Sequence, residues 1–169
     1  MKVLVVAEHN NTELLPATLH TVNAANQIGS SDLLVIGSKC ENVVKSSINV
    51  NGINKVLCCD NDIYKNQLAE NASTLIKSIA EEYTHIFFAN IANGKHIAPR
   101  VAALLDVMIV PDIIEIIDHQ TFKRPIYASN AIATCESNDT FKVVTVRTTA
   151  FEKANVSDQE VEVTNLEAD

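Results

Sequence analysis

Tryptophan is absent from this sequence of 169 residues, and glycine and proline occur only four times each. So few glycines and prolines exclude a collagen-like repeat and a low-complexity segment rich in these residues. We also find no internal repeat. Because 47% of the residues are apolar, the chain can bury a core large enough for a single globular domain.

Long apolar runs and clusters of basic residues are missing as well. The apolar run at residues 3–6 is too short for the core of a signal peptide or for a membrane span. The formal net charge of -8 argues against nucleic-acid and anionic membrane partners, because both require clustered Lys and Arg. We therefore expect a soluble intracellular protein without membrane insertion.

The glycine-rich phosphate-binding motifs GxxxxGK[ST] and GxGxxG do not occur. An adenine nucleotide could still bind outside the carboxyl ends of parallel strands, where the strand order reverses, with Asn10, Asn11 and Thr12 as hydrogen-bond donors. The interpretation that we favour for these three residues is a polar loop that caps the first helix.

No residue pattern indicates a metal site or a catalytic centre. The four cysteines form no CxxC pair, and Cys58 and Cys59 are adjacent on an expected strand, so their side chains should point to opposite faces. The five histidines are scattered, and Asp112 and Glu115 should project to opposite faces of one strand. We therefore expect free thiols, no metal and no enzymatic activity.

The first half of the chain alternates short apolar runs with stretches of helical periodicity, which indicates βαβ units and a parallel sheet. The expected strands cover residues 2–7, 33–36, 55–59 and 85–89. Pro16 suits the first turn of the first helix and Gly29 its carboxyl-terminal stop, which would give roughly four turns.

The second half should begin with a helix at residues 95–106, with Pro99 near its first turn. Strand-like segments follow at residues 112–117, 124–128, 131–135 and 141–147, and short connections such as residues 136–140 predict hairpins. The sequence thus predicts a three-layer α/β domain over residues 1–150, with a parallel sheet extended by antiparallel strands. Residues 151–169 carry six acidic residues and one lysine, so we expect an acidic linker or tail there.

Polar and basic residues collect near loops of the second half, including all three arginines. Arginine at a partly buried surface suits bidentate hydrogen bonding across a protein interface. The candidate interface residues are Asn93, Lys95, Arg100, Arg124, Asn130 and Arg147. Isolated surface ion pairs are the alternative interpretation.

Three segments, in order along the chain, resemble the alpha-subunit family of the electron transfer flavoproteins. They read LVVAEH at residues 4–9, GKHIAPRVAALLDV at residues 94–107 and RPIYASNA at residues 124–131. Shorter matches are KVL at residues 55–57, PDI at residues 111–113 and VRTTAFE at residues 146–152. Each motif alone is weak, but together they span nearly the whole chain. Ser129 stands where family members commonly carry Gly, which suggests a slightly altered turn.

The resemblance implies an amino-terminal domain with an adenine-nucleotide alpha hydrolase-like fold, within a heterodimer of alpha and beta subunits. That heterodimer carries FAD and passes electrons from acyl-CoA and other dehydrogenases to a membrane quinone oxidoreductase, as in fatty acid beta-oxidation. In this family the flavin belongs mainly to the carboxyl-terminal domain of the alpha subunit, and AMP belongs to the beta subunit. The glycine-rich and GISGA-like segments of the flavin domain are absent here.

The resemblance therefore implies a fragment that serves as a scaffold and subunit-binding domain, without FAD or AMP of its own. Its partners would be the beta subunit and its own flavin domain, and the dehydrogenases would be reached through the full complex. The expected location is the bacterial cytoplasm, or the mitochondrial matrix for a processed eukaryotic protein. The alternative function is a free-standing adenine-nucleotide-binding module of the universal-stress type.

Overall fold

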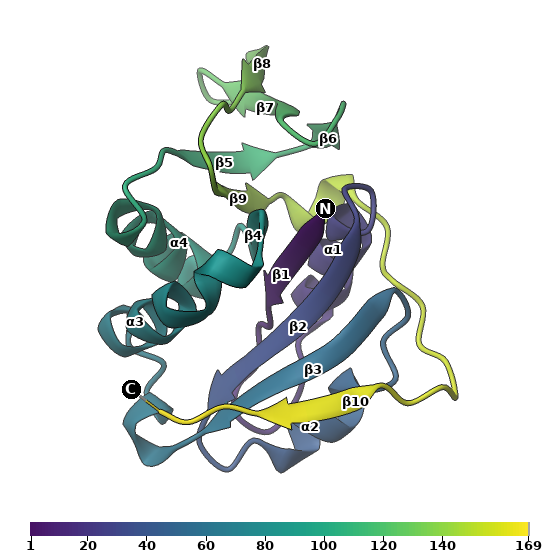
Figure 1. Cartoon of the computed structure of the whole chain (residues 1–169). Coiled ribbons are helices and arrows are strands. Elements are labelled where there is room, and N and C mark those ends of the chain that lie inside the picture. Colours follow the sequence, from purple (N-terminus) through teal and green to yellow (C-terminus); the bar gives the residue numbers. More distant parts are fainter. Residues whose placement is uncertain (169) are drawn as a thin grey trace.

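The computed structural model describes residues 1–168 and contains a seven-stranded parallel sheet beside a small antiparallel sheet (Figure 1). The parallel sheet has the order β10-β3-β2-β1-β4-β9-β5. Its strands are β1 (Lys2–Val6), β2 (Ser30–Gly37), β3 (Ile53–Asp60), β4 (His85–Ala89), β5 (Ile109–Ile113), β9 (Lys142–Val146) and β10 (Glu162–Asn165). The predicted α/β fold with a parallel sheet is confirmed.

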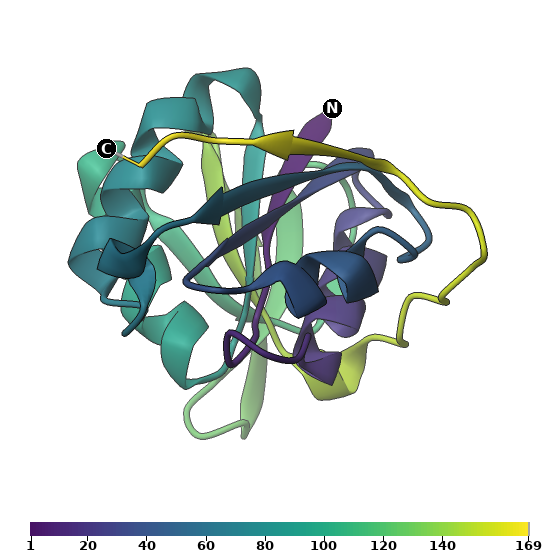
Figure 2. The same ribbon diagram turned by 90° about the horizontal axis from the view of Figure 1, so that it is seen from below.

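Helices cover both faces of the parallel sheet and complete three layers (Figure 2). On one face lie α1 (Pro16–Ala25) and α2 (Glu41–Ser47), and on the other lie α3 (Ala69–Ile79) and α4 (Ala92–Leu104). Three short 3-10 helices are η1 (Asp62–Tyr64), η2 (Ala80–Glu82) and η3 (Thr148–Ala150). No helix within residues 1–168 is long and apolar enough to cross a membrane.

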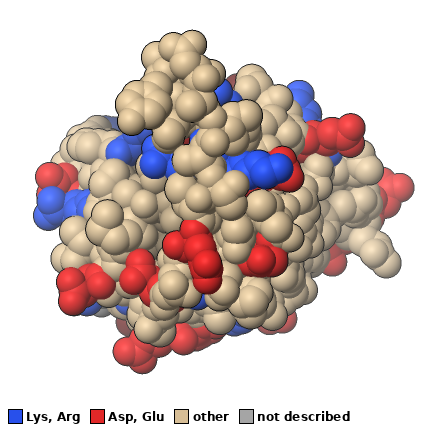
Figure 3. All heavy atoms as spheres, turned by 90° about the horizontal axis from the view of Figure 1, so that it is seen from above, with Lys and Arg blue, Asp and Glu red and all other residues tan. Residues whose placement is uncertain are grey.

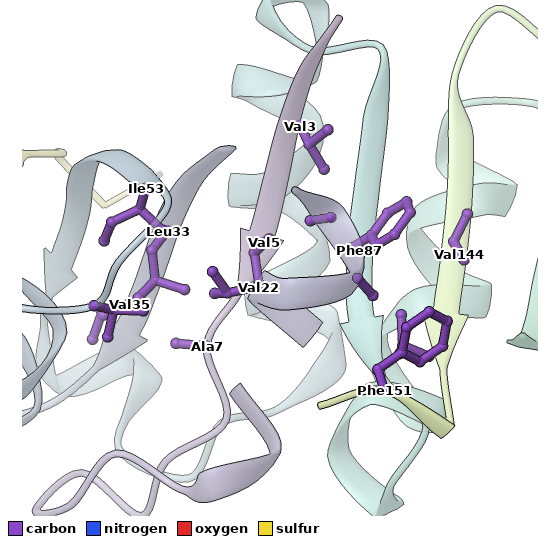
Figure 4. Packing of buried hydrophobic residues seen from close by; sticks show 14 of the residues in the cluster. Val3, Val5, Ala7, Val22, Leu33, Val35, Ile53, Phe87, Val144 and Phe151 are labelled. Atoms are coloured by element: carbon purple, nitrogen blue, oxygen red, sulfur yellow. The ribbon is translucent and has the colours of Figure 1, made fainter. Parts of the chain in front are cut away.

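The central strand β1 supplies side chains to two separate cores, because successive residues of a strand point to opposite faces. Val3 and Val5 pack in the layer of α1 and α2, where Figure 4 shows them with Val22, Phe87 and Val144. Leu4 and Val6 pack in the layer of α3 and α4. The run of apolar residues in β1 is therefore explained by burial on both faces.

The small sheet projects beyond strand β5 at the edge of the parallel sheet (Figure 1). It consists of β6 (Glu115–Ile116), β7 (Thr121–Ile126) and β8 (Ala131–Glu136). Phe122 of β7 is completely buried in the core below. The buried imidazole of His85 in β4 adds a second attachment, since its Nε2 lies 2.6 Å from the backbone oxygen of His119 in the β6–β7 turn. The ring of Phe122 and the hydrogen bond of His85 thus help to anchor the small sheet to the parallel sheet.

The expectation of a hairpin across residues 136–140 is wrong. Strand β8 ends in the small sheet, whereas β9 crosses into the parallel sheet and lies between β4 and β5. The reason is burial, because residues 143–146 of β9 are buried on both faces while β8 alternates half-buried and exposed residues.

Two helix boundaries also differ from the sequence-based expectations. Helix α1 begins at Pro16 as predicted but ends at Ala25, so Gly29 follows its end by several residues and lies just before β2. Helix α4 begins at Ala92, so Pro99 lies inside it rather than in its first turn. Gly94 permits the early start, because a Cβ there would lie 2.0 Å from the backbone oxygen of Ala89.

The described segment after position 150 lies along the α/β unit. Within this segment β10 pairs in parallel with β3, from Glu162 beside Lys55 to Asn165 beside Cys58. Most side chains of β10 are exposed. The segment therefore adds an edge strand, and its role as a linker stays a prediction.

Candidate functional site

The strand order of the parallel sheet reverses between β1 and β4, and ligands of open α/β sheets bind at such a point. Glu8 follows β1 there and is only 4% exposed. Its carboxylate accepts hydrogen bonds from the Asn93 side chain and from the Gly94 amide in the first turn of α4. Burial raises the pKa of Glu8 to about 7, although these two hydrogen bonds act in the opposite direction.

This arrangement affects anion binding at the switch point. The amide groups at a helix amino terminus are the donors that phosphate groups use in nucleotide-binding α/β folds. In this chain a carboxylate of the protein itself already accepts from the Gly94 amide. A nucleotide phosphate would therefore have to displace Glu8.

The rest of the crevice at the switch point is filled by Gln67. Its Nε2 lies 3.1 Å from Nδ1 of His9 and donates to the backbone oxygen of His9 at 3.3 Å. The remaining cavity, which also borders Val6 and Ile36, has a volume of about 10 Å³. This space suits about one water molecule, whereas ligand pockets measure about 300–1,000 Å³. This small cavity does not fit an adenine nucleotide or a flavin.

The polar loop after β1 has a different role from the one expected. Leu15 is the N-cap of α1 and makes no side-chain cap hydrogen bond, so the expected capping of α1 by residues 10–12 is wrong. Asn10 instead accepts from the amides of Thr12 and Glu13, and Asn11 donates to the backbone oxygen of Lys65. The loop fixes its own conformation and joins the segment after β3.

A second polar cluster joins the carboxyl ends of β4, β9 and β5. The Asp112 carboxylate accepts from the Asn90 amide and from the guanidinium of Arg147, whose Nε lies 3.0 Å from Oδ1. The Asp112 amide donates to Oγ1 of Thr145 at 2.8 Å. The hydrogen bond to Asp112 raises the pKa of Arg147, which therefore stays charged at all physiological pH values. The cluster thus connects the ends of three neighbouring strands through groups of the chain itself.

The expectation that Asp112 and Glu115 share one strand is wrong. The φ of 61° at Asp112 coincides with an irregularity in the pairing of β5, and β5 and β6 belong to different sheets. Glu115 pairs with Lys123 at 2.9 Å on the small sheet. The two carboxylates thus have separate basic partners.

The loop between β7 and β8 presents uncharged side chains to solvent. Tyr127, Ala128 and Ser129 are all exposed and have φ values of 49°, 52° and 69°. Tyr127 is 80% exposed, and the neighbouring Ile132 is 61% exposed. Figure 3 shows the face that carries the small sheet, with an uncharged projection and basic side chains near its base.

The candidate interface residues lie on separate elements. Asn93, Lys95 and Arg100 are on α4, and Lys95 and Arg100 are exposed. Arg124 is on β7, Asn130 is in the exposed loop after it, and Arg147 follows β9. Two of the six have internal roles, because Asn93 binds Glu8 and Arg147 binds Asp112.

Cys40, Cys58, Cys59 and Cys135 form no disulfide within the described residues. Cys58 and Cys59 point to opposite faces of β3, as predicted, since they belong to different cores. Within residues 1–168 no group of His, Cys, Asp and Glu side chains is arranged to hold a metal ion.

Three polar groups of the structure were missed in the sequence. Glu8 and Asn90 each follow an apolar strand directly, and this position at a strand end was the available signal. Ser137, 7% exposed with a buried hydroxyl that has no hydrogen-bond partner among the described residues, carried no such signal. Its burial depends on the packing of two sheets.

Comparison with known proteins identifies the family. The electron transfer flavoprotein domain model matches residues 3–169. The electron transfer flavoprotein subunit alpha of Pseudomonas aeruginosa is 48% identical over 153 residues, covering 90% of this chain and 50% of the relative.

Two further relatives give the same result. The mitochondrial alpha subunit of Dictyostelium discoideum is 45% identical over 163 residues, covering 91% of this chain and 46% of the relative. The alpha subunit of Paracoccus denitrificans is 39% identical over 155 residues, with 91% and 50% covered. The chain thus spans about half the length of these curated relatives. It belongs to the electron transfer flavoprotein family, on the side of the alpha subunits.

Proposed function

We propose that this chain is the amino-terminal scaffold and subunit-interaction domain of an electron transfer flavoprotein alpha subunit. The full heterodimer would carry electrons through FAD from acyl-CoA and other dehydrogenases to a quinone oxidoreductase. The names of the relatives support the role in electron transfer. The compartment would be the cytoplasm in a bacterium and the mitochondrial matrix in a eukaryote.

One observation carries the proposal: the crevice at the switch point is filled by Glu8 and Gln67. A cavity of about 10 Å³ remains there, so this crevice offers the flavin no site. FAD would therefore be held outside these residues, and the contribution of this domain would be to support the subunits that hold it. AMP would likewise belong to the beta subunit.

Cofactor binding tests this part of the proposal. We expect the purified chain to be colourless after incubation with FAD and gel filtration, and to give no saturable heat with AMP or ATP in calorimetry. The beta subunit mixed with AMP serves as the positive control. Stoichiometric flavin in the chain would refute the proposal. Saturable AMP binding would favour the universal-stress type of module instead.

The exposed loop between β7 and β8 supports an assembly role. Its three consecutive residues have positive φ, a conformation that is unfavourable for residues other than glycine, and they hold Tyr127 away from the sheet. Exposure of Tyr127 to solvent does not offset this conformational free energy. We expect the chain to bind a purified beta subunit of the same organism and to lose affinity when Tyr127 is replaced by Ser. A Thr134→Ala variant, on the exposed side of β8, is the matched control and should bind normally. Equal affinity of all three proteins would exclude the loop from the interface.

A further inference from the structure

A cavity of about 320 Å³ lies between strand β5 and the small sheet. Strand β5 forms one edge of the parallel sheet, so this cavity opens at a free sheet edge. Its walls are Met108, Ile109, Val110 and Pro111 on one side, and Arg124, Cys135 and residues 136–139 on the other. The cavity therefore combines an apolar wall with a guanidinium.

Arg124 has no internal carboxylate. None of the ion pairs in residues 1–168 includes it, and its Nε is buried without a hydrogen-bond partner among those residues. The two other arginines differ, since Arg147 binds Asp112 and Arg100 is exposed on α4. A buried guanidinium nitrogen without an acceptor is costly, because burial removes the water that would otherwise bind it.

Ser137 gives a second, independent indication at the same cavity. It is 7% exposed, and its Oγ is buried without a partner. Three buried side-chain atoms in the described residues lack a partner, and two of them belong to residues that line this cavity. Two residues that line the cavity therefore each carry a buried donor without a partner among the described residues.

The acidic residues of the cavity do not supply the missing acceptor. Oδ2 of Asp139 accepts from the Met108 amide at 3.0 Å. Oε1 of Glu136 accepts from Nε2 of Gln120 at 3.1 Å, and Glu136 is exposed. Both carboxylates thus already accept hydrogen bonds from other groups of the chain.

We propose that this cavity is a binding site for an acidic side chain of the partner subunit, held by Arg124 and Ser137. A carboxylate can accept from the planar guanidinium of Arg124 through two oxygens and from the Ser137 hydroxyl at the same time. The proposal rests on the proposed function, since it assigns an anchor point to the same assembly surface. The occupant is an acidic group, because the guanidinium of Arg124 forms no ion pair within residues 1–168 and its Nε has no acceptor there.

The test compares the full chain and its variants for binding to the purified beta subunit. Arg124→Met removes the guanidinium and keeps an unbranched stem. We expect a Kd at least 10-fold higher, mostly through faster dissociation, because the pair is desolvated. Ser137→Ala should raise the Kd about 3-fold. Lys123→Met is the matched control, since Lys123 is the next residue and pairs with Glu115 on the outer side, and its Kd should change less than 2-fold.

Thermal unfolding of the free chain separates binding from folding. A residue kept for a partner at the expense of stability gives a more stable protein when it is removed. We therefore expect the Tm of Arg124→Met to be unchanged or about 2–4 °C higher than that of the original chain. A lower Tm would assign Arg124 a structural role and overturn the inference.

The partner's carboxylate is identified by replacing each acidic residue of the beta subunit by its amide. One replacement should weaken binding as much as Arg124→Met, with no further loss when the two are combined. If the original chain binds and Arg124→Met binds equally well, this inference alone fails. If the original chain does not bind, the proposed function fails with it. A dimer of the free chain that Arg124→Met dissociates would assign the cavity to a second copy and overturn the choice of partner.

Discussion

The carboxylate of Asp112 accepts two hydrogen bonds from the guanidinium of Arg147, and this pair joins the carboxyl ends of β5 and β9. Asp112 also accepts from Asn90 after β4, so one carboxylate connects three neighbouring strand ends. We expect Asp112→Ala to lower the free energy of unfolding by about 2–3 kcal/mol, because three donor atoms of Asn90 and Arg147 lose their acceptor.

Two variants refine this prediction. Asp112→Asn should cost about 1 kcal/mol less than Asp112→Ala, because Asn tolerates the φ of 61° and still accepts one hydrogen bond. Lys123→Ala breaks the exposed pair with Glu115 and should change the stability by less than about 1 kcal/mol. Urea unfolding measures all three. Equal losses in Asp112→Ala and Lys123→Ala would contradict a structural role for the cluster.

Glu8 predicts a decrease of stability with rising pH. Its carboxyl keeps a proton up to a pKa of about 7 in the folded chain, against 4.5 without the protein environment. Between these values the folded state binds more protons, so the free energy of unfolding decreases as the pH rises from about 4.5 to 7 and then levels off. The loss is on the order of 3 kcal/mol.

Urea unfolding from pH 5 to 8 tests this prediction when the original chain is compared with Glu8→Gln. The difference between the two proteins should change in favour of Glu8→Gln as the pH rises. The exposed Glu13→Gln is the control and should follow the original chain. A constant difference in the free energy of unfolding between the original chain and Glu8→Gln over this range would refute a raised pKa of Glu8 in the folded chain.

His85 predicts the opposite trend at lower pH. Burial lowers the pKa of its imidazole to about 4, although the hydrogen bond to His119 acts against this shift. The unfolded state therefore binds more protons between about pH 6.5 and 4, and the contribution of His85 to stability is lost as the pH falls through this range. We expect the His85 ring signals in NMR to stay unchanged from pH 8 to 5.5. Titration of this ring near pH 6.5 would show that it is not held neutral.

Ser129 predicts a stabilising substitution. Its φ of 69° favours glycine, so Ser129→Gly should raise the free energy of unfolding by up to about 1 kcal/mol. Ser46→Gly is the matched control in the exposed face of α2, where the same change should cost about 0.5–1 kcal/mol. Calorimetric Tm values compare the two. A lower Tm for Ser129→Gly would mean that the serine side chain stabilises the turn.

The strands of the first half could be predicted because each is a continuous apolar run between helical stretches. Strand β4 has the predicted bounds His85–Ala89, and β2 extends the prediction at both ends. Sheet membership in the second half could not be read in the same way. Both β8 and β9 have strand-like residues, and only the uninterrupted burial of β9 marks it as a member of the parallel sheet.

The polar groups of the site were harder to predict than the strands. Arg124, Asn130 and Arg147 were selected by residue type, but type does not distinguish an arginine with an internal carboxylate from one without. Arg147 meets Asp112 only because β9 lies beside β5, and Arg124 lacks an internal carboxylate because β7 places it beside a cavity next to β5. Both facts follow from tertiary contacts between segments distant in the sequence.

The place of β9 has a consequence for how the chain folds during synthesis. Strand β5 leaves the ribosome before β9, yet its one neighbour in the parallel sheet is β9. Residues 109–113 must therefore wait for residues 142–146, and the hairpin of β7 and β8 can form locally in the meantime. Until β9 is synthesised, β4 is an open edge of the sheet in the nascent chain. An open edge can pair with other chains, so a chaperone would protect the nascent chain most at this stage.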